Sequence, residues 1–543
     1  MLYEVLPMAV AVDLLIAVTV VPTPENEPAT IEVANLSEKF PAKTFTVPDE
    51  GHVEIDNDDH HWTNYFKCGF RGAMELLRGE GWNGKSASLK VLAHGTIPTG
   101  SGLSSSAAFT CASALAVLIA NGRKQIEKSE LVNLAVVSER FVGVNSGGMD
   151  QTASVFGDKD SALYVSFVPE LKAKQFSFPK SNPPLSFLIA QTYVTADKKT
   201  TAPIHYNLRV VETTLAAQVL AKKLNLGLLP NDNGPLGSSL SGLQKTYFTK
   251  QGGEVPGVVN QLETMVDVVK ATLDKEEGYT KEEIADILET TPDALTEKYM
   301  TRFPVRAERF QLRGRALHVF GESLRVNKFA ELMMNAPENA SLSYLEAMGK
   351  LMIESQDSCR DFFDCSCPEL DLLCDIAKKA GSVGSRLTGA GWGGCTVHLI
   401  PEDKVPQVEA ALKEQYYKPK FPQVLESEDA WREAVVISKP GQATKKDVED
   451  FFVKHGHGSI QEIKLMNGFG FIEYSSPADA RDIVPNFARK SGVDVVFSEV
   501  SRNRDGSGIV EFETADDLRI AINKLDNYDF KGGRVSCTSD VGL

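Results

Sequence analysis

The chain has 543 residues, 42% of them hydrophobic and 24% charged, which is typical of a folded globular protein with two or three domains. Its formal net charge of −16 argues against nucleic acid as the main partner, because phosphate backbones are bound by basic surfaces. Small phosphorylated molecules stay possible ligands, since helix N-termini and divalent cations bind them locally.

The first long apolar run extends from Val5 to Val21, and its β-branched residues predict a pair of buried strands. It contains Pro7 and Asp13, and no Lys or Arg precedes it. A signal peptide begins with basic residues, and a membrane helix needs about 20 residues without charge. We therefore expect a cytoplasmic protein with no membrane partner.

A predicted strand at Ser88–Val91 and a predicted helix at Ala107–Ala120 flank a Gly/Ser-rich loop. Glycine lets a ligand approach the backbone, and a helix N-terminus attracts anions. No Gly-Lys-Ser/Thr follows, so this is not a Walker loop. We predict a phosphate site here; the alternative is a turn that only caps the helix. The candidate residues are Gly100, Ser101, Gly102, Leu103, Ser104, Ser105 and Ser106.

Two further runs carry candidate site residues. Asp150 follows Gly147-Gly148-Met149, a sequence that suits a carboxylate at a tight turn beside a ligand; the alternative is an Asx cap on the next segment. A Gly-rich run, residues 385–395, leads into a predicted strand at Cys395–Ile400. Between these runs we expect an exposed loop at Asn225–Gly242 and a helix from about Val305 to Val326.

Eight cysteines are present, and four of them cluster between residues 359 and 374. The cluster lacks Cys-x-x-Cys spacing and has no nearby His, so free thiols are expected rather than a zinc site.

The loop at residues 98–108 resembles the second signature of the GHMP small-molecule kinases, Pro-x-x-x-Gly-Leu-x-Ser-Ser-Ala. Asn145–Gln151 resembles the segment that carries the catalytic aspartate of galactokinases, and residues 385–395 resemble the third GHMP signature. The fungal galactokinase branch is the most similar, over roughly residues 3–440. This resemblance implies an α+β fold with two domains, a mixed sheet with helices at 1–185 and an α+β domain at 186–440.

The resemblance also implies ATP and Mg²⁺ as cofactors. The loop would hold the triphosphate, and the Ser105 hydroxyl and the Glu139 carboxylate would bind Mg²⁺. Arg140 follows Glu139 where relatives often have His. Trp62 lies in another run that resembles the family, which implies a position near the nucleotide. The alternative, a tryptophan that only fills the core, fits the sequence at least as well.

For the sugar, the resemblance implies that Asp150 takes the proton from the anomeric hydroxyl of galactose, so that galactose 1-phosphate forms. Tyr206 would pack on the sugar, and Gly147 would present its backbone to it.

The sequence departs from the family at its start. Galactokinases carry Gly-Arg-Val-Asn-Leu-Ile-Gly-Glu-His-x-Asp-Tyr just before Val-Leu-Pro-Met-Ala, whereas here Met1–Glu4 runs directly into Val5–Ala9. The absent segment would supply an arginine beside Asp150 and residues that bind sugar hydroxyls. Losing one preorganised partner costs about 10²–10³ in rate, so we expect a poor or inactive kinase. An incomplete, fused gene model is favoured over a protein that has lost catalysis.

After Pro440 the resemblance changes, and residues 441–543 are expected to form a small α/β tail, composite or fragmentary. Residues 467–474 resemble the RNP1 strand of an RNA-recognition motif, and residues 504–512 resemble a weaker second copy. Asn467 replaces the usual Lys or Arg, and the tail is slightly acidic. Phe469, Phe471 and Tyr474 would either stack on RNA bases or fill a sheet core.

Three functions are therefore weighed. The first is a galactokinase that uses ATP and Mg²⁺, and the second is a non-catalytic regulator on the same fold that senses galactose and ATP. The third is an RNA-binding protein that works through its tail. The complete Ser104–Ala108 run favours the enzyme, and the acidic tail disfavours RNA binding.

Overall fold

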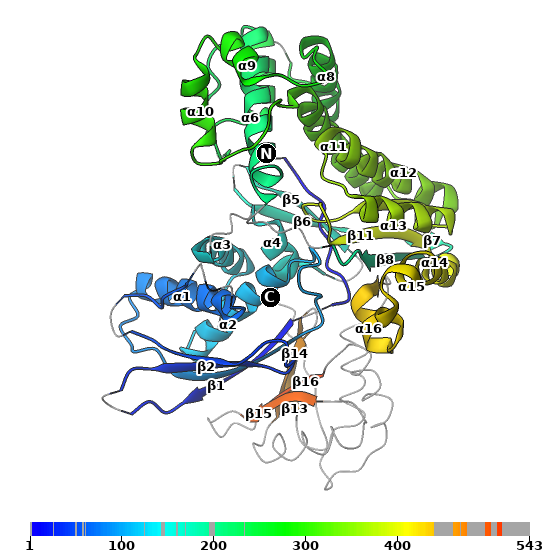
Figure 1. Cartoon of the computed structure of the whole chain (residues 1–543). Helices are drawn as coiled ribbons and strands as arrows, with labels where there is room; N and C mark the ends of the chain where they lie inside the picture. Colours follow the sequence, from blue (N-terminus) through cyan, green and yellow to red (C-terminus); the bar gives the residue numbers. More distant parts are fainter. Residues whose placement is uncertain are drawn as a thin grey trace. The chain divides into compact units, whose positions relative to one another are not determined.

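The computed structural model describes residues 3–12, 14–24, 27–48, 51–56, 59, 61–123, 125–142, 147–158, 161–168, 170–194, 201–232, 234–252, 254–438, 460–466, 469–474, 495–500 and 508–512. The chain divides into two compact units. Figure 1 labels many of the helices and strands named below. Unit 1 is drawn from Met1–Pro7, Pro98–Leu103 and Ser161–Lys439, and unit 2 from Met8–Ile97, Ser104–Asp160 and Pro440–Leu543. Among the helices so described, none has both the length and the apolar character needed to cross a bilayer.

Unit 2 contains a mixed four-stranded sheet in the order β1-β4-β2-β3. Strands β2 and β4 run parallel, and the other neighbours are antiparallel. The strand predicted at Ser88–Val91 is confirmed as the start of β4. The bounds are β1 Leu14–Val21, β2 Thr30–Asn35, β3 Lys43–Thr46 and β4 Ser88–Gly95.

The strand pair expected at Val5–Val21 is wrong. Only its second half forms a strand, β1, and that strand pairs with β4. Val5 instead makes an isolated bridge with Val165, and the Pro7 carbonyl accepts a bond from the Leu163 N–H. Pro7 has no N–H to donate, which interrupts a strand ladder at that point.

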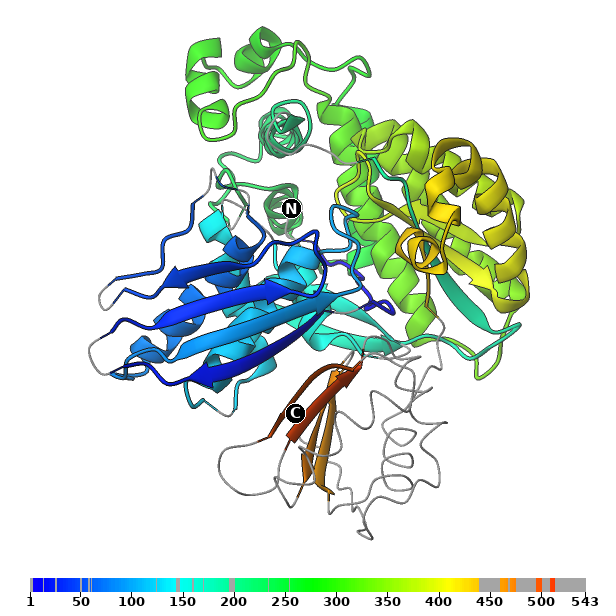
Figure 2. The same ribbon diagram turned by 60° about the horizontal axis from the view of Figure 1, so that its bottom comes forward.

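Helices cover one face of this sheet, as Figure 2 shows behind the blue strands. Phe66 and Phe70 of α1 and Val117 of α2 pack against strand residues in one core. Gly69 lets α1 and α2 approach closely, because a Cβ there would lie 2.7 Å from the Thr110 carbonyl oxygen. The helix predicted at Ala107–Ala120 is confirmed within α2. The bounds are α1 Thr63–Gly79, α2 Ser105–Ala120, α3 Lys128–Glu139, η1 Arg140–Val142 and α4 Met149–Phe156.

Unit 1 is built around a second four-stranded sheet, in the order β10-β11-β8-β12. Every residue of the central strand β8 is buried, and α13 and α14 pack against β8 and β11. The strand predicted at Cys395–Ile400 is confirmed as β11. The strand bounds are β5 Ser161–Ser166, β6 Lys172–Ser177, β7 Ser181–Asn182, β8 Leu185–Gln191, β9 Ala340–Ser341, β10 Gly384–Leu387, β11 Cys395–Pro401 and β12 Val435–Ser438.

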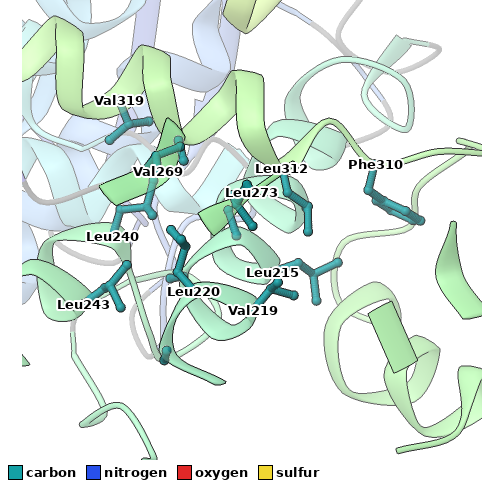
Figure 3. Close-up of a cluster of buried hydrophobic side chains, with 14 of the residues drawn as sticks. Leu215, Val219, Leu220, Leu240, Leu243, Val269, Leu273, Phe310, Leu312 and Val319 are labelled. Carbon is teal, nitrogen blue, oxygen red and sulfur yellow. The ribbon is translucent and has the colours of Figure 1, made fainter. Parts of the chain in front are cut away.

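The helices of unit 1 enclose a large apolar core (Figure 3). It joins Leu215 and Leu220 of α6 to Val269 of α8 and Val319 of α11. The bounds are α6 Tyr206–Lys223, α7 Leu240–Gln251, α8 Val258–Thr272, α9 Lys281–Ile287, α10 Pro292–Met300, α11 Leu312–Met334, α12 Leu342–Ser358, η2 Cys359–Phe363, α13 Pro368–Lys379, η3 Glu402–Lys404, α14 Val405–Leu412, η4 Lys413–Tyr417, α15 Lys418–Lys420, η5 Pro422–Leu425 and α16 Glu428–Ala434.

Two predictions for the helical part of unit 1 are wrong in their bounds or burial. The helix expected from Val305 begins only at Leu312, because Phe310 exchanges two backbone bonds with Tyr279 that hold it extended. The loop expected at Asn225–Gly242 is partly buried: Leu228 is 95% exposed, but Leu226 is buried, and α7 begins at Leu240.

The described part of the tail is an antiparallel sheet in the order β13-β14-β16-β15. The two runs that resemble RNP1 form its neighbouring strands β14 and β16. The bounds are β13 Ile460–Met466, β14 Phe469–Tyr474, β15 Val495–Val500 and β16 Gly508–Phe512.

Candidate active site

The predicted phosphate loop begins in unit 1 with Pro98–Leu103. Gly100 and Gly102 are exposed and have φ values of 71° and 80°, which L side chains rarely adopt. Ser101 is fully buried, and its hydroxyl donates to the Pro98 carbonyl at 2.5 Å and accepts from the Leu103 N–H at 3.3 Å. Ser101 therefore braces the loop from inside, while the two glycines expose backbone.

The loop continues in unit 2 with three serines at the start of α2. Ser104 has φ 64° and ψ 37°, and its side chain makes no capping bond to the helix. Ser105 and Ser106 follow in the first turn and are half-buried. First-turn N–H groups without a side-chain cap are able to bind an anion, and the phosphate site at this loop stays a prediction.

The Gly-rich run packs directly on the unit 1 part of the loop. A Cβ at Gly394 would lie 2.6 Å from the Ser101 carbonyl oxygen, and a Cβ at Gly389 would lie 3.1 Å from the Gly102 carbonyl oxygen. Both glycines also have positive φ, at 81° and 72°. Glycine is thus required here for two separate reasons, backbone conformation and close approach.

We expect Gly394→Ala to lower the free energy of unfolding by about 3 kcal/mol, as the sum of backbone strain and a steric clash. Gly122→Ala is the matched control, since Gly122 has φ 94° but nothing within 4 Å of the added Cβ. Its expected loss is about 1 kcal/mol, from strain alone. Urea unfolding of both variants measures the difference; equal losses would show that the contact with Ser101 can relax.

Glu139 ends α3 in unit 2 and is only 2% exposed. Its Oε2 accepts a bond from Nε2 of the fully buried Gln151. Burial, with a further contribution from the charge of Glu139, raises the pKa of Cys68 to about 12. Arg140, the residue at which the sequence departs from the family, is exposed, whereas the Glu139 carboxylate beside it is buried.

Oxygen donors are the ligands that Mg²⁺ prefers, and Glu139 and Ser105 supply a carboxylate and a hydroxyl from adjacent helices. Within the described ranges, no cluster of three or more His, Cys, Asp or Glu residues forms a ready metal cage. Two protein oxygens fit a Mg²⁺ ion that takes its other ligands from water and phosphate.

Asp150 lies in the first turn of α4, and Gly148, with φ 91°, is the N-cap residue. The alternative of an Asx cap at Asp150 is therefore wrong. Burial, with further contributions from the charges of Glu139 and Asp150, raises the pKa of Cys111 in α2. Both carboxylates thus act electrostatically on the same buried thiol.

The remaining predicted sugar residues lie in both units. Gly147 is exposed and precedes α4 in unit 2. Tyr206 is the first residue of α6 in unit 1, and its ring meets that of Trp392 edge-on at 4.9 Å. Trp62 stacks on Phe109 at 5.4 Å and borders the core of unit 2, as the core interpretation predicted.

Sequence reasoning did not single out Gln151, which binds Glu139 in unit 2, or Arg209 and Trp392, which contact each other beside Tyr206 in unit 1. Gln151 and Arg209 stand within four residues of predicted site residues, and Trp392 stands in the Gly-rich run. Nothing in those runs indicates that Gln151 would bind Glu139 or that Arg209 would be buried. The seven described cysteines are free thiols.

Residues 64–158 match the family described as GHMP kinases N terminal domain, and residues 341–418 match GHMP kinases C terminal. Residues 440–492 match the RNA recognition motif. The chain is 42% identical to a galactokinase of Saccharomyces cerevisiae over 459 residues, which cover 81% of this chain and 86% of the yeast protein. A Dictyostelium discoideum galactokinase is 36% identical over 76% of this chain and 80% of its own length. The crystal structure of Lactococcus lactis galactokinase complexed with galactose has the same fold, with a TM-score of 0.52, 21% identity and coverage of 81% of this chain and 88% of that protein.

Proposed function

Because the chain belongs to the galactokinases of the GHMP kinase family, ATP-dependent sugar kinases, we propose that it phosphorylates the anomeric hydroxyl of D-galactose with the γ-phosphate of ATP. The product is galactose 1-phosphate. The observation that carries the proposal is the set of packed helices α2, α3 and α4, which bear Ser105, Glu139 and Asp150.

Phosphoryl transfer depends mostly on positioning and charge neutralisation. The exposed glycines 100 and 102 and the uncapped first turn of α2 bind the phosphates through backbone N–H groups. Ser105 and Glu139 would hold Mg²⁺, which when bound neutralises phosphate charge. Gln151 fixes the orientation of the Glu139 carboxylate by its buried hydrogen bond.

Asp150 is the proposed base. Its carboxylate accepts the proton of the anomeric hydroxyl as that oxygen attacks the γ-phosphorus, and the leaving ADP takes the bonding electron pair. Tyr206 packs on the sugar, and the exposed Gly147 backbone contacts it.

The test is ADP release by the purified protein in the presence of ATP, Mg²⁺ and a single sugar. We expect release that requires galactose. Glucose, which differs from galactose only in the configuration at C4, serves as the control sugar; equal rates with both sugars would contradict the assignment of galactose.

RNA is a second candidate ligand, supported by the match of residues 440–492 to the RNA recognition motif. Alternation along a strand assigns positions 469 and 471 of β14 to one face and position 474 to the other. If the tail binds RNA by stacking, the double variant Phe469→Ala/Phe471→Ala lowers its affinity for single-stranded RNA in a filter assay about tenfold or more, while Tyr474→Phe changes it little. No retention of RNA by the unmodified chain would end this candidate.

A further inference from the structure

Arg209 is a buried guanidinium in unit 1 to which the mechanism above gives no role. It lies in α6, three residues after Tyr206, and is 4% exposed. Its Nε donates to the Phe363 carbonyl at 2.6 Å, and its Nη2 donates to the Asp364 carbonyl and carboxylate, each at 2.8 Å. One planar side chain therefore binds two successive carbonyl groups of a single turn.

Neutralisation of Glu212 does not explain this arrangement. Glu212 is fully buried, and its Oε2 already accepts from Nε of Arg315 at 2.6 Å. The bond from Arg209 Nη1 to the same oxygen is longer, at 3.3 Å. The shortest contacts of Arg209 are thus with the turn at Phe363–Asp364.

That turn holds Trp392 in the Gly-rich run. The Asp364 carbonyl accepts from Trp392 Nε1 at 3.0 Å, and the Cys365 carbonyl accepts from the Trp392 backbone N–H at 2.7 Å. Trp392 has φ 57°, a conformation that costs a non-glycine residue about 1 kcal/mol or more unless its surroundings impose it. Its ring stacks on His205 at 4.5 Å, and the Arg209 guanidinium carbon lies 5.4 Å from the ring centre.

The residues on either side of Trp392 reach the phosphate loop. Gly394 and Gly389 pack on the carbonyl groups of Ser101 and Gly102 with no space for a Cβ. An unbroken series of contacts within unit 1 therefore runs from Arg209 through the Phe363–Cys365 turn and Trp392 to the loop at Pro98–Leu103.

We propose that Arg209 is a positioning residue for ATP: it fixes the Phe363–Cys365 turn, which holds Trp392 in its left-handed conformation and so sets the Gly-rich run against the phosphate loop. This inference rests on the proposed function in taking the loop as the ATP site. Lysine cannot replace arginine here, because an ammonium group lacks the planar fork that binds two carbonyl groups at once.

The test compares Arg209→Lys with Arg313→Lys. Arg313 also lies in unit 1 and also donates to two carbonyl groups, but these belong to Lys270 and Leu273 at the end of α8 and not to the turn that holds the Gly-rich run. We expect the Kd of ATP in the presence of Mg²⁺, measured by calorimetry, to rise about tenfold in R209K and less than about twofold in R313K. Equal changes in the two variants would overturn the positioning role, because a general loss of stability would affect both.

Tryptophan emission gives a second reading that needs no ligand. We expect R209K to shift the emission of the protein to longer wavelength, and the same substitution in a Trp392→Phe background to leave it unchanged. An equal shift in both backgrounds would overturn the link from Arg209 to Trp392. If the unmodified chain binds no ATP, the proposed function fails. The emission experiment then still decides whether Arg209 holds Trp392 in place.

If R209K does not fold, Trp392→Phe carries the test, because it keeps an aromatic ring but removes the Nε1 bond to Asp364 and one ring of the indole. We expect its Kd for ATP to rise about threefold. An unchanged Kd would overturn the proposal.

Discussion

Asp150→Asn is expected to lower galactose-dependent ADP release by about 10³-fold, because an amide has the size of the carboxylate but cannot accept the proton of the anomeric hydroxyl. The Kd of ATP should stay within about twofold of its value in the unmodified protein, since the proposed phosphate contacts come from the loop at 98–106 and not from Asp150. Steady-state kinetics and calorimetry on the same preparation measure both quantities.

Asp293→Asn is the matched control for this prediction. Asp293 lies in the first turn of α10, as Asp150 lies in the first turn of α4, so both substitutions remove one favourable interaction with a helix dipole. Asp293 is exposed, whereas Asp150 is half-buried. We expect D293N to retain full activity. Loss of less than about tenfold in D150N would exclude Asp150 as the base, because general-base catalysis contributes at least about 10².

Glu139→Gln is expected to reduce the rate about 10²-fold and to raise the Mg²⁺ concentration for half-maximal activity about tenfold. Glutamine keeps the shape of the side chain and retains an oxygen that can accept the bond from Gln151, so the change is mainly one of charge. Titration of activity with Mg²⁺ at saturating ATP separates the loss of rate from the loss of Mg²⁺ affinity. Excess Mg²⁺ fills the site again, but it does not restore the rate if the bound ion lies in the wrong position.

Glu130→Gln tests whether any charge change in α3 has the same result. Glu130 stands in the first turn of the same helix and pairs with Arg123 at 2.8 Å, far along the helix from Glu139. We expect an unchanged Mg²⁺ requirement in E130Q. The same unchanged requirement in E139Q would assign Glu139 a structural role in place of metal binding.

Local sequence signals predicted elements well where a short run determines the backbone. The alanine-rich run after Ser106 gave α2, and the glycines at 100 and 102 do take positive φ. The start of α11 could not be predicted in this way, because the bridge between Tyr279 and Phe310 that delays it joins segments 31 residues apart in sequence. The Val5–Val21 run failed similarly, since the partners of its two halves are distant strands.

The candidate site also has features that follow from short motifs and features that follow from contacts between distant segments. The residues proposed for the phosphates and for the proton were read from short motifs, and Glu139 was taken from the family resemblance; all of them stay predictions. The bond from Gln151 to Glu139 and the attachment of Arg209 to the turn at Phe363 could not be predicted in this way, because each depends on how separate helices pack. The burial of Ser101 could not be predicted from the motif either, because the motif does not distinguish a buried serine of the loop from an exposed one.

The central claim is tested most directly by ADP release from the protein in the presence of ATP and Mg²⁺, measured with galactose and without any sugar, and repeated on the Asp150→Asn variant. We expect release that requires galactose and that is lost on Asp150→Asn substitution. ATP binding without galactose-dependent release would contradict the claim and favour a protein that senses galactose and ATP without catalysis.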